Sequence, residues 1–179
     1  MSKVIILSGS VRRGGNTELL VNAFCEGAKQ NNEVEIVSVA DYKVNPCIGC
    51  NSCFQRENHE CFQADDMSII YEKMKEADII VAASPTYFYG ISAQLKAMID
   101  RLHTPMRDIF HVKKVGLLLV AAATLPTVFD AIKLQYQLII DFFGLEDIGM
   151  VLVKSVKDKG DIKENIALEE AFQLGKSLS

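Results

Sequence analysis

Five short, mainly apolar segments, each followed by a longer segment of helical periodicity, constrain the fold of this chain most strongly. The apolar segments are residues 3–7, 34–39, 77–83, 115–122 and 148–153. Apolar residues recur at helical spacing in residues 19–28, 67–74, 91–102, 128–143 and 162–178. Continuously apolar strands are buried on both faces, and strand–helix alternation gives right-handed crossovers onto a parallel sheet. We therefore expect an α/β fold: a doubly wound, five-stranded parallel sheet of order 2-1-3-4-5 with helices on both faces.

Composition narrows the class of protein further. Hydrophobic residues make up 49% and charged residues 23% of the chain, as in a globular protein, and its length predicts a single domain over residues 1–179. The net charge of −4 offers no basic face for nucleic acid. The longest apolar run, residues 115–123, is too short to cross a bilayer, and residues 4–7 are too short for the core of a signal peptide. We therefore expect a cytoplasmic protein with no membrane or nucleic-acid partner.

The loop after the first predicted strand has the composition of a phosphate site. Its candidate binding residues are Ser8, Ser10, Arg12, Asn16 and Thr17. Hydroxyls, glycine amides and the start of the following helix, with Asn16 or Thr17 as N-cap, together favour a bound anion. The loop lacks the Lys-Ser/Thr ending of a P-loop and any GxGxxG, so a phosphate monoester fits better than a nucleoside triphosphate or a dinucleotide. The alternative is an ordinary solvated turn.

The loop after the third predicted strand places three consecutive aromatic residues at the same edge of the sheet. Its candidate binding residues are Pro85, Thr86, Tyr87, Phe88 and Gly90. Aromatic faces suit a flat ring system, and ligands of open α/β sheets bind beyond the carboxyl ends of the strands. The alternative is that Tyr87 and Phe88 pack into the core at the sheet edge.

These two loops, with a downstream motif, resemble the NADPH-dependent FMN reductase family. The resemblance spans about residues 3–153 and is carried by Gly9-Ser10-x-Arg12 with Asn16-Thr17, by Ser84-Pro85-Thr86-Tyr87, and by Lys96 with Asp100-Arg101. It implies a flavodoxin-like fold, FMN as cofactor, NAD(P)H as a possible co-substrate, and a homodimer or homotetramer. Residue by residue, it implies that Ser10, Arg12, Asn16 and Thr17 hold the FMN phosphate and that Pro85, Thr86, Tyr87 and Gly90 line the ribityl chain and the isoalloxazine.

A cysteine-rich insertion, residues 41–66, separates the second strand from the next helix. Cys47, Cys50, Cys53 and Cys61 form a C-x2-C-x2-C-x7-C pattern, whose first part is a ferredoxin-like spacing. Beside FMN, this pattern is similar to that of the iron-sulfur flavoproteins and implies a [4Fe-4S] cluster with these four ligands. The same thiolates could bind zinc, although structural zinc sites more often use two separated cysteine pairs. They could also be free thiols, form a disulfide or belong to a dimer contact.

The resulting functional hypothesis is an FMN-binding electron-transfer oxidoreductase of iron-sulfur flavoprotein type, in which electrons pass between a [4Fe-4S] cluster and FMN. The electron donor or acceptor would be a small molecule or a ferredoxin-like protein. The alternative is a cluster-free, NAD(P)H-dependent FMN or quinone reductase. A third possibility is a non-enzymatic flavin- or phosphate-binding module whose cysteine loop builds an oligomer interface. No catalytic side chain is predicted, because the cofactor carries the chemistry.

Overall fold

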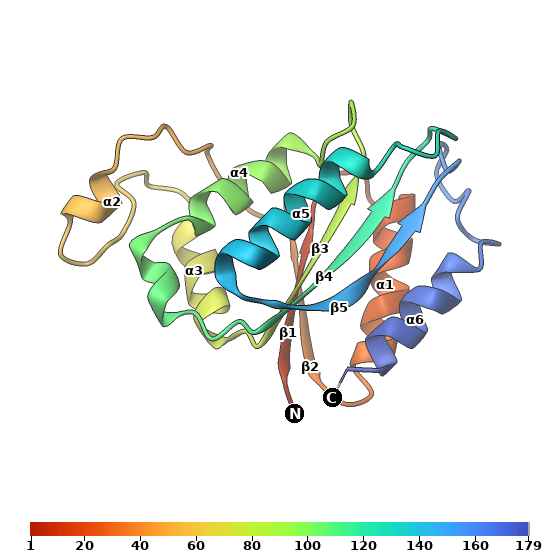
Figure 1. The fold of residues 1–179 in the computed structure, drawn as a ribbon, viewed down its shortest axis with the longest axis horizontal. Helices are drawn as coiled ribbons and strands as arrows, with labels where there is room; N and C mark the ends of the chain where they lie inside the picture. Colours follow the sequence, from red (N-terminus) through yellow and green to blue (C-terminus); the bar gives the residue numbers. More distant parts are fainter. Residues whose placement is uncertain (179) are drawn as a thin grey trace.

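Five parallel strands form one sheet in the computed structural model, which describes residues 1–178. The strands are β1 (Lys3–Ser8), β2 (Glu33–Ser38), β3 (Ile79–Pro85), β4 (Lys114–Val120) and β5 (Glu146–Val153). Their order is β2-β1-β3-β4-β5, and every pairing is parallel (Figure 1). The predicted fold class and strand order are confirmed, and the fold is flavodoxin-like.

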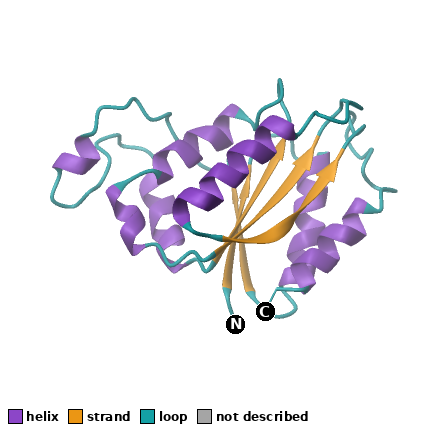
Figure 2. Ribbon diagram, viewed as in Figure 1, coloured by secondary structure: helices purple, strands orange, loops and turns teal. Residues whose placement is uncertain are grey.

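Helices cover both faces of this sheet (Figure 2). One face carries α1 (Asn16–Ala28) and α6 (Ala167–Lys176), and the other carries α3 (Met67–Glu76), α4 (Ala93–Leu102) and α5 (Asp130–Phe143). The strand side chains alternate between these layers: Val4 and Ile6 pack in the core beneath α1 and α6, whereas Ile5 and Leu7 pack with α3 and α4. Burial on both faces explains why the central strands β1, β3 and β4 are the most apolar, whereas the edge strands β2 and β5 include exposed acidic residues.

The two helices of the first layer approach each other closely because each presents a glycine at the contact. A Cβ atom on Gly27 of α1 would lie 2.0 Å from the carbonyl oxygen of Phe172, and one on Gly175 of α6 would lie 2.2 Å from that of Phe24. Neither distance is possible without moving a backbone. The α1–α6 contact therefore requires glycine at both positions.

Several boundaries differ from those expected. The predicted last helix, residues 162–178, begins only at Ala167, because turns at residues 158–164 precede it. The predicted third strand, residues 77–83, instead runs over Ile79–Pro85. The N-cap of α1 is Gly15, not Asn16 or Thr17, because the Asn16 side chain bonds to a distant loop. Within residues 1–178, none of the helices has the length and apolar character needed to cross a bilayer.

The cysteine-rich insertion extends away from the sheet beyond α3 and α4 (Figure 1). Its only regular element is the single-turn helix α2 (Ser52–Gln55). A short 3-10 helix, η1 (Pro105–Ile109), follows α4. In the view of Figure 1, the insertion and the loops after β4 and β5 lie at opposite ends of the molecule.

Candidate functional site

The two predicted binding loops adjoin each other at the carboxyl edge of the sheet. The backbone N–H of Gly9 donates to the carbonyl oxygen of Ala83 at 2.7 Å, which joins the end of β1 to that of β3. A Cβ atom on Gly9 would lie 2.8 Å from Ser92 Oγ and 2.9 Å from Leu95 Cβ, so the loop packs directly against the start of α4. Glycine at this position therefore allows the first loop to touch the second.

The loop between β1 and α1 has some donors in use and others free. The backbone N–H of Gly14 donates to the Glu18 carboxylate of α1 at 2.5 Å, and that of Gly15 donates to the carbonyl oxygen of Arg12 at 3.2 Å. Ser10 and Thr17 are buried, and the Ser10 hydroxyl accepts a hydrogen bond of 3.2 Å from the backbone N–H of Arg12. Gly15 caps α1 and contributes no side-chain hydrogen bond. The first N–H groups of a helix have no intrahelical acceptor, and the helix dipole makes this end positive. The loop can therefore bind an anion through its backbone.

Arg12 and Arg13 have different surroundings. Arg13 forms an exposed ion pair with Asp41, the first residue of the insertion. Arg12 forms no ion pair with any residue in the range 1–178, and its Nη1 donates to the carbonyl oxygen of Lys157 at 3.2 Å. Ser8 is buried at the end of β1 and lines a hollow of about 220 Å³ on the β2 side of the loop. Arg12 is thus the arginine with charge available for an anion.

Sequence reasoning missed the loop between β5 and α6, which closes over the first loop. Asn16 Nδ2 donates to the carbonyl oxygen of Asp158 at 2.9 Å. Asn16 Oδ1 accepts from the backbone N–H groups of Gly160 at 3.1 Å and Ile162 at 3.4 Å. The Asn16 amide, expected to hold phosphate, is therefore occupied in positioning this loop, and what it offers an anion is its backbone N–H.

The same loop brings a cation over the candidate phosphate site. A Cβ atom on Gly14 would lie 2.7 Å from Cε and 2.9 Å from Nζ of Lys159, so the lysine side chain crosses the glycine backbone. Gly14 also has a φ of +62°, which glycine adopts without strain. The only signal in the sequence was positional: the predicted strand order places the end of β5 at the same edge as the end of β1.

The aromatic loop after β3 is a tight hairpin. Tyr87 and Gly90 exchange two backbone hydrogen bonds of 2.9 and 3.0 Å. Phe88 and Tyr89, the two residues at the tip, have φ values of +48° and +66°, a conformation that two-residue turns normally fill with Asn-Gly. Phe88 is 98% exposed, and Tyr87 and Tyr89 are about half exposed. The aromatic side chains therefore stand out from the sheet edge and do not plug the core.

A buried hydroxyl without a partner lies at the base of this hairpin. Thr86 Oγ1 is buried and unpaired, although the Thr86 backbone N–H donates to the carbonyl oxygen of Val120 at 2.8 Å. The neighbouring Pro85 is buried as the last residue of β3. An unsatisfied buried polar group costs about 1–3 kcal/mol. A ligand that hydrogen-bonds to Thr86 would remove this cost, so the donor set fits a flavin with a polar ring edge.

The four clustered cysteines lie on the insertion with different surroundings. Cys47 and Cys50 are exposed, whereas Cys53 and Cys61 are partly buried. A hydrogen bond with Ser52 lowers the pKa of the Cys50 thiol, and burial together with the nearby Cys61, Cys47 and Cys50 thiols raises that of Cys53. Among residues 1–178, no three His, Cys, Asp or Glu side chains converge closely enough to hold a metal ion. The thiols are neighbours but not an assembled coordination sphere.

A buried ion pair fastens both ends of the insertion to α4. The side chains of Asp65 and Arg101 pair with each other and are only 1% and 3% exposed. Asp65 also accepts from the backbone N–H of Asn45 at 2.8 Å, and Arg101 Nη1 donates to the carbonyl oxygen of Asn45 at 3.3 Å. Burial alone would raise the pKa of Asp65, but the hydrogen bonds from Arg101 and the backbone hold it below its usual value. We term this arrangement the Asp65–Arg101 clamp.

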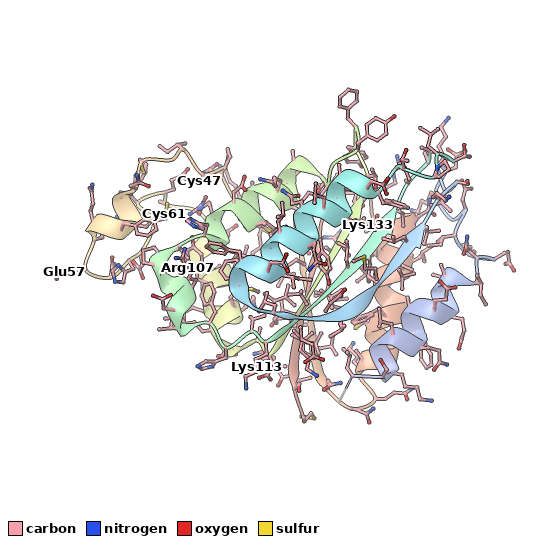
Figure 3. The ribbon with its side chains drawn as sticks, viewed as in Figure 1. Cys47, Glu57, Cys61, Arg107, Lys113 and Lys133 are labelled. Carbon is pink, nitrogen blue, oxygen red and sulfur yellow. The ribbon has the colours of Figure 1, made fainter. Side chains whose placement is uncertain are left out.

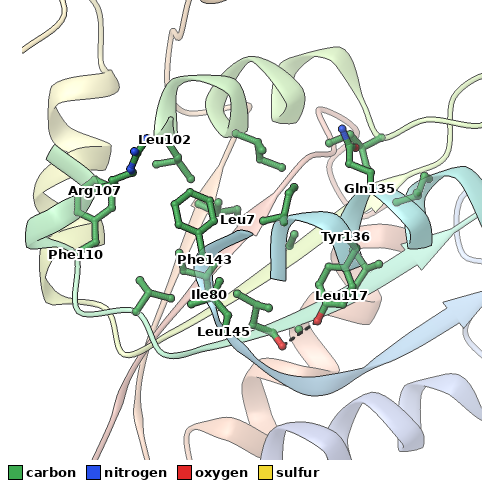
Figure 4. A pocket seen from close by; sticks show the side chains of 18 residues that line it. Leu7, Ile80, Leu102, Arg107, Phe110, Leu117, Gln135, Tyr136, Phe143 and Leu145 are labelled. Carbon is green, nitrogen blue, oxygen red and sulfur yellow. Dashed lines mark hydrogen bonds between the residues drawn. The ribbon is translucent and has the colours of Figure 1, made fainter. Parts of the chain in front are cut away.

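The most apolar cavity lies away from the predicted site. It has a volume of about 240 Å³ and is enclosed by α4, η1, α5 and the sheet (Figure 4). Its lining includes Ile80, Leu117 and Ile139, and Arg107 lies at one end with Nη1 buried and unpaired. None of the predicted binding residues lines it.

Comparisons with known proteins identify the family. The model of the NADPH-dependent FMN reductase family matches residues 2–157. An iron-sulfur flavoprotein of Methanocaldococcus jannaschii is 49% identical over 116 residues, 64% of this chain and 58% of that protein. An iron-sulfur flavoprotein of Methanosarcina thermophila is 41% identical over 116 residues, 64% of this chain and 60% of that protein. The chain thus spans about 60% of the length of these two relatives.

A solved structure extends the likeness over nearly the whole fold. The NAD(P)H:quinone oxidoreductase from Methanothermobacter marburgensis superimposes with a TM-score of 0.75 at 18% identity, covering 98% of this chain and 96% of that one. At this identity the likeness concerns the fold alone. Since the family model covers most of its length, the chain belongs to the NADPH-dependent FMN reductase family.

Proposed function

We propose that this protein is an FMN-binding electron-transfer oxidoreductase of iron-sulfur flavoprotein type, with a [4Fe-4S] cluster on Cys47, Cys50, Cys53 and Cys61. The observation that carries the proposal is the coexistence of a flavin-type loop edge with a ferredoxin-like cysteine spacing in one chain. Two relatives of matching sequence bear the name iron-sulfur flavoprotein. The partner that exchanges electrons with this protein is a small molecule or a ferredoxin-like protein.

The phosphate of FMN is assigned to the start of α1. Ser10, Thr17 and the backbone N–H groups of residues 16–17 supply hydrogen-bond donors, and Arg12 and Lys159 supply positive charge. Asn16 positions the loop that carries Lys159 through its contacts with Asp158 and Gly160. Two cations and a helix N-terminus suit a dianionic phosphate monoester.

The flavin ring is assigned to the loop after β3. Pro85 and Thr86 form the floor, with the unpaired Thr86 Oγ1 available to a polar ring atom, and Tyr87, Phe88 and Gly90 surround the ring. FMN, when bound, supplies two-electron and one-electron redox chemistry. The side chains of this chain bind and orient the cofactor and restrict water around it. None of them is assigned a proton transfer.

The cysteine donor set suits a [4Fe-4S] cluster in type and spacing. Three thiols at x2 spacing followed by a fourth resemble the pattern that places sulfurs around a cubane. Cys47, Cys50, Cys53 and Cys61 would hold the cluster, and the Asp65–Arg101 clamp holds the two ends of the segment that carries them. Cluster binding would therefore add to the stability of the folded insertion.

Metal and flavin analysis tests the assignment. We expect anaerobically purified protein to contain about four irons and four sulfides per FMN, and Cys53→Ser to lose iron while keeping FMN. Cys25→Ala is the matched control, because Cys25 is buried in α1 and lies outside the insertion. One FMN with no iron would overturn the cluster, and zinc without iron would replace it by a structural zinc site.

A second candidate is a cluster-free NAD(P)H-dependent FMN or quinone reductase. It is favoured by the exposure of Cys47 and Cys50 to solvent. It predicts iron-free yellow protein that oxidises NADH or NADPH with a quinone as acceptor. Pyridine-nucleotide oxidation that persists in a Cys47→Ser/Cys50→Ser variant would support this function over the first.

The phosphate assignment has its own test. We expect the chain to bind FMN at least about 100-fold more tightly than riboflavin, because only FMN engages the start of α1. Lys159→Met should reduce that preference and leave riboflavin binding unchanged, whereas Lys163→Met, a control on the same loop, should change neither. Equal affinity for FMN and riboflavin would contradict the phosphate site.

A further inference from the structure

The apolar cavity between α4, η1, α5 and the sheet exists because the helices on this face leave part of the sheet uncovered. Ile80 and Ala82 of β3 and Val115 of β4 line the cavity and are only partly buried. On the other face of β3, Val81 and Ala83 are fully buried in the core beneath α1 and α6. Central strands of a parallel sheet are normally covered on both faces. The floor of the cavity is therefore an apolar surface that the chain itself does not cover.

The walls of this cavity determine the size and type of molecule that it can hold. Most of the wall consists of aliphatic side chains, among them Ile91, Ile99, Leu102, Val112, Ile139 and Leu145. Its volume of about 240 Å³ exceeds the roughly 150 Å³ of an apolar cavity that binds benzene, and by the same proportion it has room for about ten carbon atoms. An alkyl chain of that length suits these walls.

One charged donor in the lining has no partner. The Tyr136 hydroxyl is already bonded, at 2.7 Å from a carboxylate oxygen of Asp147 and 2.9 Å from the carbonyl oxygen of Val115. By contrast, Nη1 of Arg107 is buried and has no hydrogen-bond partner. Arg107 and the neutral Gln135 lie toward opposite ends of the cavity (Figure 4). A buried charged donor without an acceptor is unfavourable, so the Arg107 end of the cavity favours an anionic group.

The other contacts of Arg107 leave its charge available. Asp108 is its only ion-pair partner among residues 1–178; the carboxylate lies 3.9 Å from Arg107 Nε and is 84% exposed. Such an exposed pair contributes little. Arg107 Cζ also lies 5.7 Å from the centre of the Phe142 ring, a contact that uses the face of the guanidinium and none of its hydrogen-bond donors. Because a guanidinium matches the geometry of a carboxylate, the free Nη1 suits a carboxylate ligand.

We propose that this cavity is a second binding site, which takes a medium-chain aliphatic carboxylate of about eight to ten carbons. Its carboxylate pairs with Arg107, and its alkyl chain covers the exposed floor formed by Ile80, Ala82 and Val115. A neutral molecule of the same shape fills the walls but leaves Arg107 Nη1 unpaired. The site uses none of the residues assigned to the flavin or to the cluster, so it stands independently of the proposed function.

Calorimetric titration of the protein with octanoate and with 1-octanol tests the charge and the apolar walls separately. Octanoate should bind with a dissociation constant below about 100 μM and at least about tenfold more tightly than 1-octanol. Arg107→Met should bring the two affinities to within about threefold of each other by weakening octanoate alone. Lys113→Met is the matched control, because Lys113 is an exposed cation on the segment that follows η1, and should change neither affinity (Figure 3).

A second variant fills the cavity without touching the charge. Ala82→Leu places a larger side chain on the floor and should weaken both probes about tenfold or more with an unchanged circular dichroism spectrum. No saturable octanoate binding below about 2 mM would overturn the proposal, as would equal affinity for the two probes or binding that neither variant weakens. Displacement of FMN by octanoate would place the probe in the flavin site instead. Octanoate binding that appears only on dilution of the protein would show that a second copy of the chain fills the cavity, which also overturns the proposal.

Discussion

The loops at the carboxyl edge of the sheet and the cysteine-rich insertion are held in opposite ways. The loops are tied to one another by backbone and side-chain hydrogen bonds from several elements, including those of Gly9, Asn16 and Thr86. The insertion contains one helical turn and is fastened at its ends by the Asp65–Arg101 clamp. The first region is therefore held along its length by contacts from several elements. The second is held mainly at its ends, by the clamp, by the Arg13–Asp41 ion pair and by the hydrogen bonds between Lys43 and Asp66.

The largest expected effect is loss of the clamp. Arg101→Met leaves the carboxylate of Asp65 buried and unpaired, which should lower the free energy of unfolding by about 3–5 kcal/mol. Urea denaturation measures the change. Lys96→Met is the matched control, because Lys96 pairs with Asp100 in an exposed position on the same helix, and we expect at most about 0.5 kcal/mol there.

The same variant tests the contrast between the two regions. If the clamp alone anchors the insertion, Arg101→Met in the folded protein should speed reaction of Cys47 and Cys50 with a thiol reagent and leave FMN affinity unchanged. A loss of FMN binding in the folded variant would show that the two regions are not held separately.

A variant in the loop region should lower the free energy of unfolding by less than loss of the clamp does. Asn16→Ala removes three hydrogen bonds to residues 158–162 and should lower the free energy of unfolding by about 2 kcal/mol. It should also weaken FMN binding, measured by quenching of flavin fluorescence, because the loop carrying Lys159 is no longer positioned. Asn22→Ala, at an exposed position of α1, should change neither quantity, and equal effects of the two variants would contradict this role.

Acid should loosen the insertion through Asp65. Its folded-state pKa lies below its ordinary value, so its contribution to stability is complete above about pH 4, the usual carboxyl pKa, and is lost as pH falls through the lower folded value. Unfolding free energies measured between pH 6 and pH 3 should therefore fall at the acid end. Asp65→Asn should flatten that part of the curve, and an unchanged slope in this variant would assign the acid sensitivity to other carboxyl groups.

The sheet could be predicted from sequence because burial on both faces gives the central strands β1, β3 and β4 apolar runs, and the edge strands β2 and β5, although partly exposed, still carry mainly apolar residues. The end of β3 was harder: Ser84-Pro85 has the composition of a loop, yet Pro85 still pairs in register with Val120 of β4. The start of α6 was also misplaced, since turns bound by Asn16 occupy residues 158–164. Such turns depend on contacts far apart in the chain and have no periodic signature.

In the candidate site, too, local patterns could be predicted and contacts between distant residues could not. The cysteine spacing and the two loops are local patterns and could be recognised directly. Lys159 over Gly14 and the pairing of Asp65 with Arg101 join residues more than thirty positions apart, and single charged residues carry no sign of their partners. Only the predicted strand order narrowed the set of candidate partners, because it fixed which loops lie at the same edge of the sheet.

The smallest predicted effect comes from the aromatic hairpin, where strain and ligand binding oppose each other. Phe88 and Tyr89 hold positive φ values that bulky residues avoid, and Phe88 makes almost no contact with the rest of the chain. Replacing them by the residues this turn prefers, Phe88→Asn with Tyr89→Gly, should raise the free energy of unfolding by about 1 kcal/mol.

The same variant should bind FMN more weakly, because the exposed aromatic faces are the part of the loop suited to a flat ring. Thermal unfolding with and without FMN measures both effects, and tighter FMN binding in the variant would show that the aromatic tip serves something other than the flavin. A gain in stability with a loss of affinity would identify the tip as a segment whose conformation is maintained for binding, in contrast to the insertion, whose ends are held by the Asp65–Arg101 clamp.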